Sequence, residues 1–333
     1  MLGRNAGYAT SQSQFLAGRL ASAGHQVIAV SSRLSRAGRL SDVVGTLVRN
    51  RKRVDVVIID VFGGLSFVLE DVASLLGRRF GHRIILVLHG GAFPDFAARS
   101  PRWTRRVLNR ADVVITPSEY LCETAKRLGY DAHVIPNTID MAEYPYRVRD
   151  QVSPRLLWMR SYHPLYNPMM AVRVLARLRS VFSNATLVMA GADKGFEHDV
   201  RRVAAELDVS GAVRFAGFLD HEAKVREGDA ADIYLNTNRV DNTPVSVIEA
   251  CAMGLPVIAT AVGGLAHMLR DGETGLLVPD DDDEAMAAAA QKLISDPSLA
   301  KRLSMNGRGL ALRSHWQNVR PQWESVFRQV LAS

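Results

Sequence analysis

The stretch IYLNTNRVDNTPVSVIEACAMGLPVIAT, residues 233–260, decides the fold of this chain. Two short apolar runs, 233–236 and 256–260, enclose a segment of helical composition at 244–253. Apolar strands that alternate with helices are typical of parallel sheets covered by helices on both faces. The stretch therefore predicts one β–α–β unit of a doubly wound sheet.

The same alternation of apolar runs and helical segments continues in both directions from this unit. In the second half it predicts strands at 155–159, 186–190, 213–217 and 275–278 and helices at 168–178, 197–207 and 283–294. In the first half it predicts strands at 26–30, 54–60, 83–88, 112–116 and 132–135 and helices at 11–23 and 116–128. A chain of 333 residues exceeds one typical core of about 100–150 residues, so we expect an α/β fold with two Rossmann-like, doubly wound domains.

The expected domain boundary lies near residue 148, because residues 144–150 interrupt the periodicity between two predicted strands. We expect a first domain at 1–148 and a second at 149–314. The first domain opens on a glycine loop, with Gly3 and Gly7, that no strand precedes. A strand normally comes before such a loop, and without it the neighbouring strands would expose backbone hydrogen-bonding groups. The first strand is therefore missing here, and we expect either that it is encoded upstream of Met1 or that this domain is unstable as written.

The composition excludes several classes of protein. Its two cysteines, Cys122 and Cys251, provide neither a disulfide framework nor a cysteine-based metal site, and this usage fits a reducing cytoplasm. No apolar run reaches the roughly 18 residues that a transmembrane helix requires. The acidic run 280–283 predicts the solvated start of a helix, where carboxylates suit the helix dipole. We therefore expect a cytoplasmic protein without a metal site.

The net charge of +7 is distributed unevenly. Residues 1–150 hold 21 Lys and Arg against 13 Asp and Glu, whereas the rest hold 20 against 21. The arginine-rich segment 99–110, which includes Trp103, is either a set of solvated helix faces or a surface for an anionic membrane. No nucleic-acid-binding motif accompanies the charge, so we do not expect nucleic acid as a partner.

Candidate binding groups gather around the predicted helix at 244–253. We expect Thr243 to cap this helix and Pro244 to fill its first position, so that the amides of Val245 and Ser246 face outward in a field that suits phosphate. Asp241 and Glu249 are acceptors for sugar hydroxyls. The combination of a phosphate site with two acids predicts that the ligand is a nucleotide sugar.

This stretch resembles the retaining glycosyltransferases of family 4, glycosyltransferase group 1. That family carries two glutamates separated by seven residues, and here Asp241 and Glu249 keep the spacing. The motifs IPNTID at 135–140, VRFAG at 213–217 and DGETGLLV at 271–278 are also similar to the family pattern. The resemblance implies the GT-B fold, in which two Rossmann-like domains face each other across a cleft. It also implies that a C-terminal helix, here 315–333, crosses back to the first domain.

The resemblance assigns roles to individual residues. Glu249 would hold the donor ribose, Asp241 the hydroxyls of the transferred sugar, and Arg160 the departing diphosphate. The family's lysine after that arginine is absent from residues 163–168, and Lys194 is the candidate to replace it. His89, followed by two glycines, resembles the family's histidine beside the donor sugar. Gly7 and Gly217 match glycine positions that approach the donor.

The implied reaction moves a hexose from a UDP- or GDP-sugar to a hydroxyl of a carbohydrate, lipid-linked or small-molecule acceptor. It retains the anomeric configuration and uses no metal and no cofactor. Two alternatives stay open. The shortened acid at Asp241 and the absent lysine fit a degenerate relative that binds a sugar nucleotide or a partner without turnover. A sugar-nucleotide epimerase would need further acid–base groups, for which His89 and His163 are the candidates.

Overall fold

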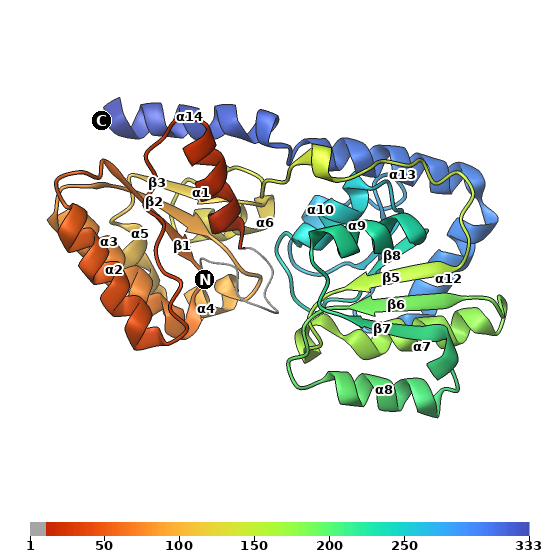
Figure 1. Cartoon of the computed structure of the whole chain (residues 1–333). Coiled ribbons are helices and arrows are strands. Elements are labelled where there is room, and N and C mark those ends of the chain that lie inside the picture. Colours follow the sequence, from red (N-terminus) through yellow and green to blue (C-terminus); the bar gives the residue numbers. More distant parts are fainter. Residues whose placement is uncertain (1–10, 333) are drawn as a thin grey trace. The chain divides into compact units, whose positions relative to one another are not determined.

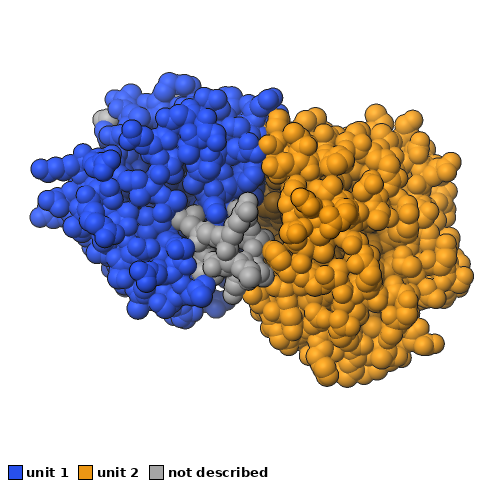
Figure 2. Space-filling model, viewed as in Figure 1, with its two compact units in different colours: residues 1–138, 316–333 blue, residues 139–315 orange. Residues whose placement is uncertain are grey.

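The computed structural model describes residues 11–332 (Figure 1), so Gly3 and Gly7 lie outside the described residues. The chain divides into two compact units (Figure 2): residues up to Thr138 together with Trp316–Ser333, and Ile139–His315. This division precedes the expected boundary at 148. The reason is that Ile139, Met141 and Tyr144 are buried in the core of the second unit.

The first unit contains a parallel sheet in the order β1-β2-β3-β4. Its strands are β1 (Val56–Val61), β2 (Arg83–Leu88), β3 (Val113–Thr116) and β4 (His133–Val134). Its helices are α1 (Gln12–Ser22), α2 (Arg36–Asn50), α3 (Phe67–Arg79), α4 (Phe93–Arg99), α5 (Pro101–Leu108), α6 (Glu119–Arg127) and α14 (Trp316–Ala332), with the short 3-10 helix η1 (Gly64–Ser66).

The expected strand at 26–30 is wrong for the described structure. This segment has no strand hydrogen bonding, and Val27 and Ile28 are 38% and 48% exposed. Strand β1 ends the order of the sheet, and no strand among residues 11–332 pairs with its outer side. An apolar run becomes a strand only where a neighbour completes its hydrogen bonds, and 26–30 has no such neighbour in the described part of the chain.

Helices cover both faces of the first sheet. On one face, Val319, Trp323, Val326 and Val330 of α14 pack against β2 and β3. On the other, Phe67 of α3 joins a core with β1, β2 and the helices α4–α6. The last helix therefore completes the core of the unit that contains the start of the described chain.

The second unit contains a six-stranded parallel sheet in the order β10-β9-β8-β5-β6-β7. Its strands are β5 (Arg155–Met159), β6 (Thr186–Ala190), β7 (Val213–Gly217), β8 (Ile233–Asn236), β9 (Val257–Thr260) and β10 (Leu276–Val278). Its helices are α7 (Pro168–Arg179), α8 (Glu197–Glu206), α9 (His221–Ala230), α10 (Val245–Ala252), α11 (Leu265–Met268), α12 (Asp283–Ser295) and α13 (Pro297–Leu312), with the 3-10 helices η2 (Met141–Glu143), η3 (Pro164–Tyr166) and η4 (Ser210–Ala212).

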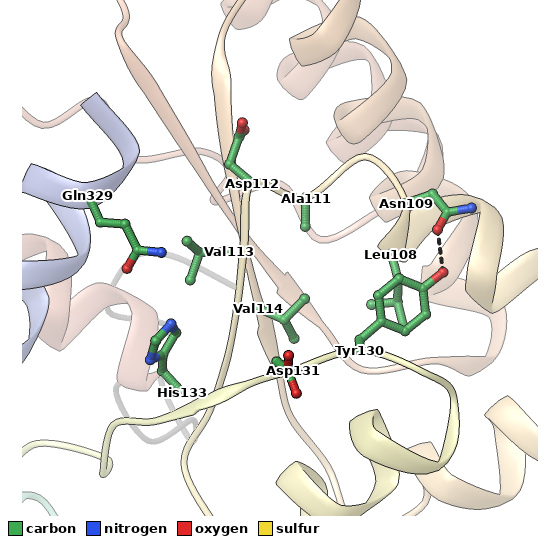
Figure 3. A pocket seen from close by; sticks show the side chains of 10 residues that line it. All are labelled: Leu108, Asn109, Ala111, Asp112, Val113, Val114, Tyr130, Asp131, His133 and Gln329. Atoms are coloured by element: carbon green, nitrogen blue, oxygen red, sulfur yellow. Dashed lines mark hydrogen bonds between the residues drawn. The ribbon is translucent and has the colours of Figure 1, made fainter. Parts of the chain in front are cut away.

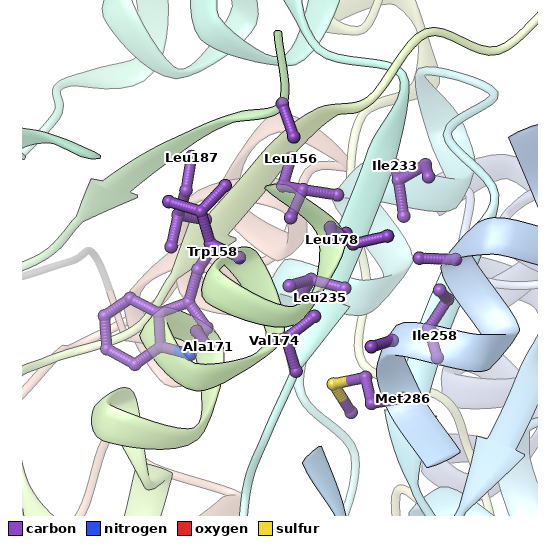
Figure 4. Packing of buried hydrophobic residues seen from close by; sticks show 14 of the residues in the cluster. Leu156, Trp158, Ala171, Val174, Leu178, Leu187, Ile233, Leu235, Ile258 and Met286 are labelled. Atoms are coloured by element: carbon purple, nitrogen blue, oxygen red, sulfur yellow. The ribbon is translucent and has the colours of Figure 1, made fainter. Parts of the chain in front are cut away.

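Two apolar layers cover this second sheet. One contains Trp158 of β5, Val174 of α7 and Met286 of α12 (Figure 4), and the other includes α10. The acidic run 280–283 starts α12, as expected, because Asp282 accepts the N–H of Ala285 at 2.8 Å. No helix within residues 11–332 has the length and apolar content of a membrane span.

Glu70 is a buried carboxyl on α3 of the first unit. The whole residue is 2% exposed, and its Oε1 accepts the N–H of Phe62 at 3.1 Å. Burial raises the pKa of Glu70 to about 7, against the hydrogen bonds of the 62–66 loop, which lower it. The folded unit therefore holds this proton more tightly than the unfolded chain does.

We expect the first unit to lose stability as the pH rises from about 4.5 to 7, by about 3 kcal/mol from Glu70 alone. Glu70→Gln keeps an uncharged acceptor for Phe62 and should remove most of this loss. Urea unfolding at pH 5 and pH 8, followed by tryptophan fluorescence, measures the difference. Glu123→Gln, at an exposed site on α6, is the control. Equal pH slopes for wild type and Glu70→Gln would contradict the assignment.

Candidate active site

The site in the second unit forms where the strand order of the sheet reverses. The chain runs from β5 outward through β6 and β7, and then returns to β8 on the other side of β5. In open α/β sheets, ligands bind at the carboxyl ends of the strands that flank such a reversal. Arg160 directly follows β5 and Asp241 follows β8, so this topology brings the two predicted residues together.

Arg160 and Asp241 form an ion pair. Nη2 of Arg160 donates to Oδ2 of Asp241 at 2.6 Å. The same oxygen accepts from Nδ2 of Asn238 at 2.6 Å, and Oδ1 accepts the N–H of Asn242 at 2.7 Å. The carboxylate is therefore held on both oxygens, in a fixed orientation.

The guanidinium of Arg160 packs against the face of an aromatic ring. Its carbon lies 4.0 Å from the centre of the Tyr166 ring, within the range of a cation–π interaction. Its Nε is buried and has no hydrogen-bond partner among the described residues. A buried donor without a partner is costly, so this atom favours an anionic ligand.

Glycines permit the close approach of the loops around this ion pair. A Cβ on Gly191 would overlap the carbonyl of Arg160, and one on Gly264 would overlap the carbonyl of Asn242. Gly263, with φ of 48°, meets the carbonyl of Asp241 in the same way. The N–H of Gly264 donates to the carbonyl of Asp241 at 3.0 Å. The glycine pair 263–264 thus supports the loop that carries the acid.

The start of α10 differs by one residue from the expectation. Pro244 is the N-cap and Val245 the first helical residue, so Thr243 does not cap the helix. Proline takes the cap itself because its φ of −66° fits the extended backbone there. The N–H of Val247 bonds back to the carbonyl of Pro244 at 3.1 Å. The N–H groups of Val245 and Ser246 precede that bond, and the helix provides no acceptor for them.

Glu249 lies on α10 and is 6% exposed. Its Oε1 accepts from the Tyr144 hydroxyl at 2.9 Å and from Nζ of Lys224 at 2.6 Å. Burial raises the pKa of Tyr144, and the nearby Glu249 carboxylate raises it further, so the tyrosine remains a donor. Sequence reasoning missed both partners. Lys224 could have been found from its place in the first turns of the helix that follows β7 and Gly217.

Lys194 and Gly217 lie at the same carboxyl edge of the sheet. Lys194 is exposed in the connection from β6 to α8, and its N–H donates to the carbonyl of Tyr162 at 3.3 Å. Gly217 ends β7 with φ of 65°, and its carbonyl accepts the N–H of Gly191 at 2.8 Å. Lys194 therefore follows β6, which is next to β5, and Gly217 ends β7, one strand further out.

In the first unit, His89 follows β2 and contacts an acid at the end of β1. Its Nε2 donates to Oδ1 of Asp60 at 3.0 Å, and its ring stacks on Phe62 with centroids 5.1 Å apart. Burial would raise the pKa of Asp60, but hydrogen bonds from His89 and Ser13 hold it below its usual value. Asp60 is a further residue that the sequence motifs did not reveal.

A cavity of about 330 Å³ opens at the opposite edge of the first sheet, at the amino ends of β3 and β4 (Figure 3). Two of its polar groups bond to each other, since the Tyr130 hydroxyl donates to the Asn109 side chain. Asp112 is paired with Arg83 at 3.3 Å. This cavity does not include any residue of the predicted site.

The arginine-rich segment of the first unit is only partly a free surface. Trp103 donates its indole N–H to Asp71 at 2.7 Å and packs edge-on against Phe67, so it is half-buried and held in the fold. Arg106 and Arg110 pair with the same carboxylate. Arg99, Arg102 and Arg105 remain exposed on α4 and α5.

Comparison with known proteins identifies the class of this fold. The structure of Anabaena Alr3699/HepE in complex with UDP matches with a TM-score of 0.73 and 17% identity, over 86% of this chain and 81% of that one. Sucrose-phosphate synthase from Thermosynechococcus elongatus matches with a TM-score of 0.77 and 20% identity, over 96% and 92%. The chain has the GT-B fold of glycosyltransferases.

The family follows from two family models. "Glycosyltransferase Family 4" matches residues 13–143, and "Glycosyl transferases group 1" matches residues 149–310. Together they cover most of the chain, which belongs to the family 4 glycosyltransferases. The chain is a glycosyltransferase.

Curated relatives have related names. D-inositol 3-phosphate glycosyltransferase of Acidothermus cellulolyticus is 29% identical over 306 residues, 82% of this chain and 68% of the relative. Phosphatidyl-myo-inositol mannosyltransferase of Mycobacterium leprae is 28% identical over 237 residues, 69% of this chain and 62% of the relative. The chain thus spans about two thirds of the length of these relatives.

Gly264→Ala tests the close approach that supports Asp241. The new methyl group has to displace the carbonyl of Asn242, so we expect a loss of about 1–3 kcal/mol in the stability of the second unit. Gly309→Ala is the matched control, because a Cβ there meets nothing within 4 Å and lies inside α13. That change should stabilise by about 0.5–1 kcal/mol. Thermal unfolding measures both, and an unaltered Gly264→Ala protein would refute the steric argument.

Proposed function

We propose that this enzyme transfers a hexose from a UDP- or GDP-sugar to an acceptor hydroxyl, with retention of the anomeric configuration and without a metal ion or cofactor. The observation that carries the proposal is the meeting of Arg160 and Asp241 at the reversal of the strand order, next to the start of α10. This arrangement places a cation, the N-terminal amides of a helix and an acid on one edge of one sheet.

The donor diphosphate is assigned to Arg160 and to the amides of Val245 and Ser246. Two features support this assignment. The Nε of Arg160 is a buried donor that lacks a partner in the described chain, and helix amides at an N-terminus favour anions. Lys194, from the connection after β6, is proposed to supply the second cation in place of the family's lysine. Positive charge from protein groups then takes the role that a metal ion has in other transferases.

The nucleoside and the sugar are assigned to the two acids. Glu249 is proposed to accept the ribose hydroxyls through Oε2, because Oε1 already accepts from Tyr144 and Lys224. Asp241 is proposed to accept hydroxyls of the transferred sugar. Its carboxylate is oriented by Asn238 and Arg160. Gly217 approaches the donor without a side chain.

The proposed reaction breaks the bond between the anomeric carbon and the diphosphate oxygen. The acceptor oxygen forms the new bond on the same face, and its proton passes to the departing diphosphate. Arg160 and the helix amides stabilise the negative charge that develops on the leaving group. Catalysis of this kind depends on positioning and on electrostatic stabilisation in a preorganised site.

The acceptor is assigned to the first unit, where His89 is fixed by Asp60 and Phe62 at the carboxyl edge of the sheet. The names of the relatives, D-inositol 3-phosphate glycosyltransferase and phosphatidyl-myo-inositol mannosyltransferase, favour an acceptor that carries phosphate or lipid. The exposed arginines on α4 and α5 fit such an acceptor. We therefore propose that the enzyme acts in the cytoplasm, at the inner face of the membrane, in glycolipid or polysaccharide synthesis.

Turnover of a panel of UDP-, GDP- and ADP-sugars with EDTA present tests the activity. We expect release of nucleoside diphosphate with one donor, and a product whose anomeric configuration, read by NMR, equals that of the donor. Arg160→Ala should lower kcat about 1,000-fold and Lys194→Ala about tenfold, because each removes a cation from the leaving group.

Several outcomes would contradict this assignment. Binding of a sugar nucleotide without turnover would instead support a degenerate relative, and conversion of the free donor to its epimer would support an epimerase. Full activity of Lys194→Ala beside an inactive Arg160→Ala would exclude Lys194 as the second cation.

Binding to vesicles tests the membrane assignment. Arg102→Gln/Arg105→Gln should weaken binding to phosphatidylglycerol vesicles about tenfold or more, at roughly 1 kcal/mol for each basic residue near the surface. Arg226→Gln/Arg270→Gln removes the same charge from exposed sites of the second unit and should bind like wild type. Sedimentation at low salt measures both, and absence of wild-type binding there would rule out this surface.

A further inference from the structure

We propose that Asp281 is a positioning residue, which holds together the two loops that carry Arg160 and Asp241. The inference rests on the proposed function, because it concerns the geometry of the same site. Asp281 lies in the turn between β10 and α12, outside the motifs that suggested the site residues.

One carboxylate joins three segments of the second unit. Oδ1 of Asp281 accepts from Nδ2 of Asn167 at 2.8 Å and from Nη2 of Arg173 at 2.7 Å. Oδ2 lies 3.0 Å from Nη2 of Arg239. Hydrogen bonds from Asn167 and Arg239 hold the pKa of Asp281 below its usual value, so it is charged at neutral pH.

Two of these partners belong to the loops of the site. Asn167 ends the loop that starts at Arg160, and Arg239 lies between β8 and Asp241. The loops also bond directly, because the N–H of Arg239 donates to the carbonyl of Leu165 at 2.8 Å. Oγ1 of Thr237 likewise donates to the carbonyl of Tyr166 at 2.7 Å. Asp281 bonds to both loops from a third segment of the unit.

The backbone around this contact is left-handed on both sides. Asn167 has φ of 45° and Asp281 has φ of 58°, a region that few residues with a side chain adopt and in which Asn and Asp are enriched. Residues in this region cluster at functional sites, where the surrounding structure holds them. Here the side chains of the two left-handed residues bond to each other, which ties both turns to one interaction.

Residues of these two loops contact the side chains that we assign to the donor. The Tyr166 ring, next to Asn167, lies under the Arg160 guanidinium at 4.0 Å. Asn238, next to Arg239, orients Asp241 at 2.6 Å. A shift of either loop therefore moves the groups assigned to the diphosphate and to the sugar. Glu249 and the amides of α10 have no contact with Asp281 among the bonds described, so the nucleoside end should be insensitive to it.

Asp281→Gly removes the carboxylate and keeps the turn, because glycine adopts φ of 58° without cost. With the donor that wild type turns over, we expect kcat to fall about tenfold or more, since small misplacements of reacting groups are costly. The dissociation constant of the nucleoside diphosphate should change less than twofold. Asp281→Asn keeps an acceptor for Asn167 and should restore part of kcat.

Asp280→Asn is the control, since Asp280 faces Arg239 more loosely, at 3.6 Å. It should match wild type. An unchanged kcat in Asp281→Gly would overturn the inference and leave the proposed function standing. A decrease in nucleotide affinity and melting temperature that accompanies the decrease in kcat would also overturn the inference, because it would indicate general destabilisation. Absence of turnover by wild type with every donor would overturn the proposed function, and with it the positioning role.

Discussion

The ion pair between Arg160 and Asp241 is the interaction on which the site of the second unit depends. It forms because β5 and β8 are neighbours at the reversal of the strand order, so their carboxyl ends bring residues far apart in sequence together. The backbone of the loops that carry this pair also leaves no room for neighbouring side chains. Gly191, Gly263 and Gly264 lie against the backbone of its two loops, where a Cβ would collide.

The two acids of the site are each matched to a cation. Asp241 pairs with Arg160, and Glu249 pairs with Lys224 at 2.6 Å. Pairing fixes the direction of each carboxylate, so less ordering remains when a ligand binds. Among the described residues, Nε of Arg160 has no hydrogen-bond partner, and the first amides of α10 have no acceptor within the helix. The site is thus preorganised for an anion next to a hydroxyl-rich group.

Local sequence predicted most strands, because their apolar runs are bounded by polar or glycine-containing turns, as at 155–159 and 186–190. It failed at 26–30, where a strand depends on a partner that local sequence does not specify. Asp241 and Glu249 were proposed from the motif and its spacing, and Arg160 from the family resemblance. Tyr144 and Lys224, which contact Glu249, and Asp60, which contacts His89, were not predicted, because each reaches its partner from another element of its unit. The expected cap at Thr243 was wrong, because the adjacent proline takes that position.

The return of α14 to the first unit has a consequence for the order of folding during synthesis. The second unit is one continuous segment, Ile139–His315, whereas the first needs Trp316–Ser333 as well. Val319, Trp323, Val326 and Val330 are synthesised after the whole of the second unit, yet they cover one face of the sheet of the first unit. The first unit is therefore completed only after the second has been made, and its apolar sheet face has to wait for α14.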